Sequence, residues 1–259
     1  MAESKKVHPV HAPTEADPFN RLSDKELARV KKGHAHVFGH GHRCKTDTVG
    51  FPRPENRSPF ELVVDASEGF IPLWEKETIL RWRFQEQSLI HFSSPSAAKT
   101  AIRTLLGNAL LAWGDAVPVK FAERNDAWDF EIVVRESEDC DINGCVLASA
   151  FFPDAGRHEL VIYPTMFSES TKEQVDTLAH ELGHVFGLRH FFAKVSEKKW
   201  PSVRFGRHKP FSIMNYGAKS VMTAADQSDL KLLYDKVWSG DLEQINGTPI
   251  KLVYPFHAA

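Results

Sequence analysis

One stretch of eleven residues constrains this chain more than any other. Residues 180–190 read His-Glu-Leu-Gly-His-Val-Phe-Gly-Leu-Arg-His, which is the pattern H-E-x-x-H-x-x-G-x-x-H. On an α-helix, residues four positions apart lie on one face, so His180 and His184 can bind one ion together. Gly187 permits a left-handed turn that ends the helix and returns the chain. His190 can then complete a set of three imidazoles.

Three imidazoles and an open fourth position are typical of a catalytic zinc site, because a structural zinc is closed by a fourth protein ligand. Glu181 lies too far round the helix to be a good ligand, yet close enough to reach a water molecule in that fourth position. The alternative is a surface helix that carries three histidines by chance. A buried stripe at spacings of three and four argues against it and predicts that the histidines face a cleft: Val175, Leu178, Leu182 and Val185.

A second motif follows the histidines. Residues 212–217, Ser-Ile-Met-Asn-Tyr-Gly, resemble the Met-turn that accompanies this histidine pattern in the metzincin clan of zinc endopeptidases. The resemblance implies that Met214 is an apolar floor beneath the zinc and not a ligand, whereas an isolated methionine would be read as ordinary core. Tyr216 is more like the astacin and serralysin branches, where such a tyrosine approaches the zinc. It is either a hydrogen-bond donor to the oxyanion or a packing residue at the pocket rim.

Within the clan, the chain resembles the matrixins (matrix metalloproteinase-like) over roughly residues 74–238. Residues 74–84 resemble the first strand of that family, and residues 112–121 its first helix end and second strand. Residues 147–153 resemble the edge strand that pairs with substrate. The resemblance therefore implies a protein or peptide substrate that adds as a strand to Val146, Leu147, Ala148, Ser149 and Ala150.

The chain also departs from the matrixin pattern. The interval between His190 and Met214 is longer than usual, which predicts an inserted loop. The acidic and histidine runs that bind structural zinc and calcium are mostly missing, and only Asp139, Asp141 and His158 remain near the expected place. Calcium thus follows from the resemblance alone, without a clear motif, and we interpret these residues as exposed loop charges.

Three cysteines add a further hypothesis. Cys140 and Cys145 flank a short loop and form either a local disulfide, in an oxidising compartment, or two thiols. Cys44 lies upstream of the first strand in His-Arg-Cys-Lys, where matrixin zymogens carry a cysteine switch that fills the fourth zinc position. The usual Pro before and Gly after the Arg-Cys pair are absent. Cys44 is therefore either a switch or an incidental surface thiol.

Composition and charge exclude other classes of function. The chain of 259 residues carries 32 basic and 34 acidic side chains, which gives no electrostatic case for nucleic acid or an anionic membrane. No run approaches the ~18 apolar residues that a membrane helix needs. No apolar leader follows Met1, so we expect a cytoplasmic or non-classically secreted protein if the sequence is complete, and an extracellular one if it is a mature form. We expect a monomer.

The element pattern predicts an α+β fold with a twisted, mostly parallel sheet, an antiparallel edge strand and two long helices. Residues 1–59 are polar and rich in His and Pro, and we interpret them as a pro-like or autoinhibitory segment. Residues 60–259 form the expected catalytic domain, with an upper subdomain over about 60–187 and a small irregular lower subdomain over about 188–259. Strands are expected near 78–84, 119–123, 130–135, 146–151 and 160–163, and helices near 95–113, 171–186 and 223–237.

These observations predict a zinc-dependent endopeptidase. Zinc bound by neutral His180, His184 and His190 would activate water at neutral pH, and Glu181 would act as the general base. The alternative hypothesis is a catalytically silent zinc-binding or interaction protein on a metzincin scaffold. The presence of Glu181 argues against that alternative, because a degenerate copy would be free to lose it.

Overall fold

The computed structural model describes residue 19 and residues 62–65, 69–141, 144–189, 202–205, 212–214, 221–245 and 247–257. Within these ranges the chain mixes helices with parallel and antiparallel strands, so the predicted α+β class is confirmed. None of the helices in the described part of the chain is long and apolar enough to cross a membrane.

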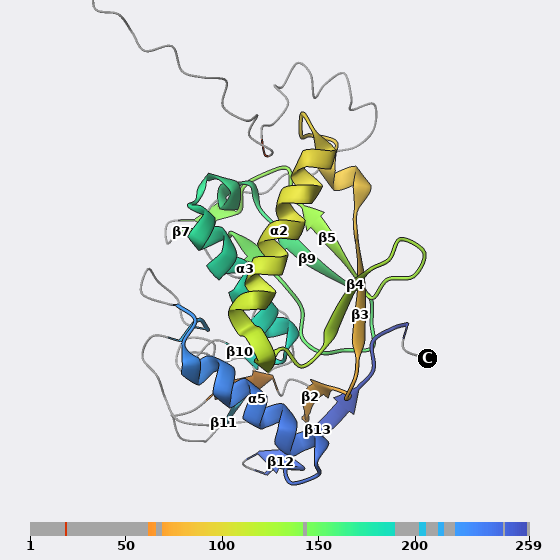
Figure 1. Ribbon diagram of the computed structural model, residues 1–259, viewed down its shortest axis with the longest axis vertical. Helices are drawn as coiled ribbons and strands as arrows, with labels where there is room; N and C mark the ends of the chain where they lie inside the picture. Colours follow the sequence, from red (N-terminus) through yellow and green to blue (C-terminus); the bar gives the residue numbers. More distant parts are fainter. Residues whose placement is uncertain are drawn as a thin grey trace, which may run out of the picture.

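A five-stranded sheet forms the main body of the fold (Figure 1), in the order β4-β3-β5-β9-β8. Its strands are β3 (Ile79–Phe84), β4 (Lys120–Glu123), β5 (Phe130–Val134), β8 (Ala148–Ser149) and β9 (His158–Ile162). β3 pairs in parallel with β4 and β5, and β5 pairs in parallel with β9. β8 runs antiparallel to β9 at the edge. The predicted mostly parallel sheet with an antiparallel edge strand is therefore confirmed, although the edge strand is shorter than expected.

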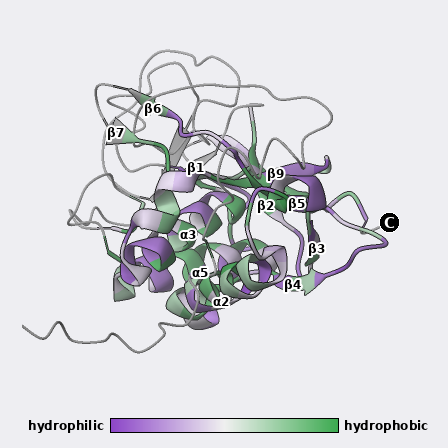
Figure 2. Ribbon diagram, turned by 90° about the horizontal axis from the view of Figure 1, so that it is seen from above, coloured by the Kyte–Doolittle hydropathy of each residue, from purple (hydrophilic) through white to green (hydrophobic). Residues whose placement is uncertain are grey.

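Two long helices, α2 (Pro95–Trp113) and α3 (Thr171–Val185), lie on one side of this sheet (Figure 2). A third, α5 (Ala224–Trp238), lies below them in Figure 1, near β12 (Gln244–Ile245) and β13 (Thr248–Val253). Their starts follow from local chemistry. The side chain of Ser94 accepts a hydrogen bond from Ala97 N before Pro95, and that of Ser170 accepts one from Glu173 N. Thr223 and Asp226 form a reciprocal capping box at the start of α5.

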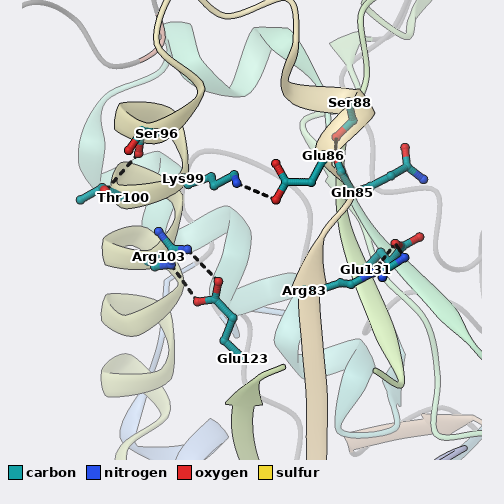
Figure 3. A network of polar contacts seen from close by, with 10 residues as sticks. All are labelled: Arg83, Gln85, Glu86, Ser88, Ser96, Lys99, Thr100, Arg103, Glu123 and Glu131. Atoms are coloured by element: carbon teal, nitrogen blue, oxygen red, sulfur yellow. Dashed lines mark hydrogen bonds and ion pairs between the residues drawn. The ribbon is translucent and has the colours of Figure 1, made fainter. Parts of the chain in front are cut away.

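Ion pairs connect α2 to strand β4 and to the segment that follows β3 (Figure 3). Arg103 on α2 makes a bidentate contact with Glu123 on β4, with two N···O distances of 2.7 Å. This hydrogen bonding lowers the pKa of the Glu123 carboxyl below its ordinary value. Lys99, one turn earlier, pairs with Glu86 at 2.6 Å. Because these pairs are partly exposed, we expect each to contribute less than ~1 kcal/mol, and burial of the helix's apolar stripe fixes its position.

The strand expected near residues 78–84 is confirmed as β3, but the segment 74–84 that resembles the first matrixin strand is not one continuous strand. β2 (Ile71–Trp74) ends before a tight turn, in which Glu77 has a φ of 63°, and β3 begins at Ile79. β2 belongs to another sheet, where it pairs in parallel with the C-terminal strand β13 (Thr248–Val253). β13 pairs antiparallel with β12 (Gln244–Ile245). The C-terminal residues therefore return to the start of the described domain.

A small hairpin and a second three-stranded sheet complete the fold. β6 (Cys140–Asp141) pairs antiparallel with β7 (Gly144–Cys145), and a disulfide joins Cys140 to Cys145. The structure thus contains the disulfide form of this pair, the first of the two alternatives. A third sheet has the order β10-β1-β11, made by β10 (Leu188–Arg189), β1 (Leu62–Asp65) and β11 (Ser202–Phe205).

Candidate active site

Helix α3 carries the first half of the histidine motif, and side chains from elsewhere in the chain donate hydrogen bonds to the carbonyl groups at its C-terminal end. The indole nitrogen of Trp74 donates to Val185 O at 2.6 Å, and the Tyr234 hydroxyl donates to Phe186 O at 3.1 Å. These carbonyls would otherwise lack partners at a helix end. Gly187 then has a φ of 91°, as expected of the turn that ends the helix.

His180 and His184 point toward each other from α3. Their Nε2 atoms lie 3.1 Å apart. On the far side of each ring, His180 Nδ1 lies 2.7 Å from Ile213 O and His184 Nδ1 lies 2.7 Å from Leu188 O. A carbonyl oxygen can only accept a hydrogen bond, so each Nδ1 carries the proton and donates. In the neutral rings, both Nε2 atoms therefore present lone pairs to the same point.

Two lone pairs at this separation repel unless a cation lies between them. A separation of 3.1 Å is short enough for both Nε2 atoms to bind one zinc ion at the usual Zn–N distance of about 2.0–2.1 Å. The two histidines therefore fit a shared zinc ion. The backbone carbonyls that fix their ring orientations are the outer partners that metal-binding histidines usually have.

Glu181 lies between His180 and His184 in the sequence, and its side chain is buried, with a residue exposure of 1 %. Burial of a carboxylate is costly unless cations or hydrogen-bond donors surround it. Glu181 follows His180 directly on α3, the helix that carries both imidazoles. Burial this complete is therefore expected of a carboxylate that has cationic or hydrogen-bond-donating partners in the folded protein.

The turn at Ser212–Met214 packs against α3 beside His180. Ile213 supplies the carbonyl that orients His180, and Met214 is 1 % exposed. A Cβ added to Gly183 would lie 2.3 Å from Met214 Sδ, so the thioether packs directly on the α3 backbone between the two histidines. Met214 therefore lies against α3 at Gly183, one residue before His184.

Asp226 is a residue that sequence reasoning missed. Its carboxylate accepts from Ser212 Oγ at 2.5 Å, from Ile213 N at 3.4 Å and from both polar groups of Thr223 at 2.7 and 2.8 Å. It is 4 % exposed and joins the start of α5 to the turn that orients His180. The T-x-x-D spacing before an apolar helical run was the available signal.

The edge strand expected to bind substrate lies beside the site. Among its residues, Val146 and Ala148 are buried, while Leu147, Ser149 and Ala150 are half-buried. β8 contacts α3, and the ring of Phe152 packs edge-on against His184 with a centroid separation of 5.5 Å. The edge strand and the histidine pair are therefore neighbours in the folded chain.

Three residues of the sequence-based site lie outside the described residues: His190, Tyr216 and Cys44. Among the described residues, one further group has metal-ligand side chains close together, namely Glu138, Cys140 and Cys145. The disulfide removes both thiolates, and Glu138 already accepts from Thr165 N at 3.0 Å. We do not assign a metal to this group.

Sheet, helices and histidine pair together define the class as a metzincin-type α+β domain. Residues 73–197 match the family Peptidase_M10: Matrixin, so this segment is a matrixin-like metzincin domain, and the family implies zinc dependence and a peptidase-type function. Among solved structures, the chain is similar to "Structure of myroilysin", with 13 % identity, a TM-score of 0.42 and coverage of 66 % of this chain and 98 % of that one. No curated protein matches the chain.

Proposed function

We propose that this protein is a zinc-dependent endopeptidase whose metal is bound by His180, His184 and His190. The observation that carries the proposal is the histidine pair, with Nε2 atoms 3.1 Å apart and both Nδ1 atoms engaged by carbonyls. The matrixin match supports the same reaction class. His190 follows β10 directly, and we expect it to supply the third imidazole.

A bound zinc supplies Lewis-acid chemistry: it makes water nucleophilic at neutral pH and polarises the scissile carbonyl. The chain's own residues provide the rest. The Glu181 carboxylate accepts the proton of the attacking water and delivers it to the leaving amine. The Tyr216 hydroxyl donates a hydrogen bond to the developing oxyanion, a contribution of up to ~3 kcal/mol.

Substrate is expected to bind in an extended conformation along residues 146–150. Addition of a strand to a sheet edge gives affinity through main-chain hydrogen bonds, so the enzyme would accept unfolded or loop segments of proteins. β8 is suited to this role because it is the edge strand of its sheet and lies next to α3. Alternate substrate side chains would then enter the site region and set specificity.

The N-terminal segment, residues 1–59, is proposed to keep the enzyme latent, with residues 60–259 as the catalytic domain. Cys44 would act as a thiolate in the open zinc position. Cys44→Ser in the full chain should then raise activity without cleavage, because a hydroxyl is a much poorer zinc ligand. Equal activity of the two proteins would assign Cys44 to the surface. The disulfide of Cys140 and Cys145 favours maturation in an oxidising compartment.

Metal analysis tests the proposal. Purified without chelator, the protein should contain about one zinc per chain, and His184→Ala should lose it. A zinc-free protein that takes up no added zinc would contradict the proposal. The catalytically silent alternative predicts one bound zinc with no hydrolysis of any unfolded protein.

A further inference from the structure

Strand β1 lies upstream of the matrixin-matched segment but is built into the surroundings of the histidine site. Leu62–Asp65 is the middle strand of a three-stranded antiparallel sheet. On one side, Val63 pairs with Arg189 and Val64 with Leu188. On the other side, β1 pairs with all four residues of β11. In the folded chain, β1 therefore lies beside the two residues that separate Gly187 from His190.

The partner strand β10 needs this support. β10 is only two residues long and directly follows Gly187, whose φ is 91°. Neither a helix nor a long strand therefore holds the backbone of Leu188 and Arg189 in place. Yet Leu188 O accepts from His184 Nδ1 at 2.7 Å and thereby sets the orientation of that ring. A carbonyl that orients a metal ligand must itself be fixed in place.

Arg189, the second residue of β10, is connected to His184 through the ring of Phe152. The guanidinium carbon of Arg189, a fully buried residue, lies 4.8 Å from the centre of the Phe152 ring, and that ring packs edge-on against His184. Any shift of β10 would thus alter both the polar and the aromatic contact of the imidazole.

We infer that Leu62–Asp65 is a positioning strand for the metal site: its ladder to β10 fixes the Leu188 carbonyl, and through it the tautomer and direction of His184. The inference rests on the proposed function in one respect, namely that His184 binds a metal. An activating cut that leaves the site intact would then have to fall before Leu62.

The backbone alternation of a strand suggests a matched pair of variants. Neighbouring residues direct their N–H and C=O groups to opposite sides. Leu188 turns its carbonyl toward His184, so Arg189 is the β10 residue that faces β1, and its partner is Val63. By the same alternation, Val64 directs its N–H and C=O groups toward β11, where its partner is Val203. Proline removes the N–H at either position, so Val63→Pro interrupts the ladder to β10 and Val64→Pro the ladder to β11.

The experiment measures zinc affinity of the two full-length variants by competition with a chromophoric chelator. Nitrogen-15 spectra of the histidine rings in the zinc-free proteins report the tautomer of His184. Val63→Pro should weaken zinc binding by about 10- to 100-fold, the usual effect of losing an outer partner of a metal ligand, and should lose the protonated Nδ1 of His184. Val64→Pro should be less stable than wild type but keep both the affinity and the tautomer.

Two other results would overturn either the inference or the proposed function, and they can be told apart. If Val63→Pro keeps wild-type zinc affinity and tautomer, or if both variants lose them equally, β1 is not a specific positioning strand and the inference is wrong. If wild-type protein itself binds no zinc, the proposed function fails. In that case the tautomer measurement still decides whether β1 orients His184.

Discussion

Met214 Sδ occupies the space that a side chain at Gly183 would need: a Cβ built on Gly183 would lie 2.3 Å from it. The same Cβ would lie 3.1 Å from Met214 Cε and 3.3 Å from Trp113 Cζ2. Gly183 sits between His180 and His184 on α3. Gly183 is thus the point where Met214 packs against the helix that carries the two histidines.

Gly183→Ala is therefore expected to destabilise the protein, even though alanine is the better helix former. The propensity gain is at most ~1 kcal/mol, whereas overpacking a buried site costs about 1–3 kcal/mol. Thermal unfolding should show a melting temperature lowered by a few degrees. Adding Met214→Ala should recover part of the loss, because the two changes compensate sterically and are not additive.

Gly107→Ala is the matched control. Gly107 lies on α2, and nothing lies within 4 Å of a Cβ built there. This substitution should raise stability by up to ~1 kcal/mol. If both alanine variants were equally stable, the contact between Gly183 and Met214 would not constrain the helix.

Asp226→Asn should disturb both stability and the metal site. The amide replaces an acceptor oxygen with a donor, so donors from Thr223, Ser212 and Ile213 compete for the one that remains. We expect a loss of about 2 kcal/mol or more and a weaker zinc affinity as the Ile213 carbonyl moves. Asp235→Asn, on the same helix but paired only with Lys231 at the surface, should stay within ~0.5 kcal/mol of wild type. Similar losses in both variants would contradict the role of Asp226.

How far the sequence predicts this fold depends on the kind of pattern. α2, α3 and α5 each combine an apolar stripe with a capping residue, and their predicted ranges differ from the observed ones by one residue or less at most ends. β1, β10 and β11 were not predicted, since four residues or fewer carry no periodicity and their partners are far apart in the chain. The division of residues 74–84 was missed because a left-handed Glu77 has no sequence signature.

In the site, the residue types that bind an ion are visible in the sequence, but their outer partners are not. His180 and His184 follow from a spacing on one helix. The carbonyls of Ile213 and Leu188 belong to every residue type, so no pattern marks them. Asp226 had a weak local signal, which explained a helix start and gave no hint of the contact with the Met-turn.

His158 lies on strand β9 with its side chain mostly buried, so its interpretation as an exposed loop residue is wrong, and it should make stability depend on pH. Burial lowers the pKa of this imidazole below its ordinary value, and Asp154, with an N···O distance of 3.9 Å, only partly opposes this. The unfolded chain therefore binds a proton at a higher pH than the folded one, so stability falls as pH decreases through about 6.5. Unfolding at pH 7 and pH 5 should show a smaller loss for His158→Gln than for wild type. Parallel losses would exclude His158 as a source.

Tyr216→Phe should lower kcat with little change in KM if the hydroxyl acts on the oxyanion, because such an interaction is made mainly in the transition state. Met214→Leu, which nearly conserves the volume of an apolar residue, should keep most of the activity. Steady-state kinetics on one peptide substrate compare the two. An unchanged kcat in the phenylalanine variant would assign Tyr216 to packing alone.

The central claim is that the histidine pair and Glu181 together form a hydrolytic zinc site. The most direct measurement is hydrolysis of an unfolded protein by zinc-loaded wild type and zinc-loaded Glu181→Gln, with the metal content of both determined. Both proteins should hold about one zinc, and the glutamine variant should be slower by about 10²–10⁴-fold, since only the proton carrier is removed. Equal hydrolysis rates, or no hydrolysis by zinc-loaded wild type, would contradict the account.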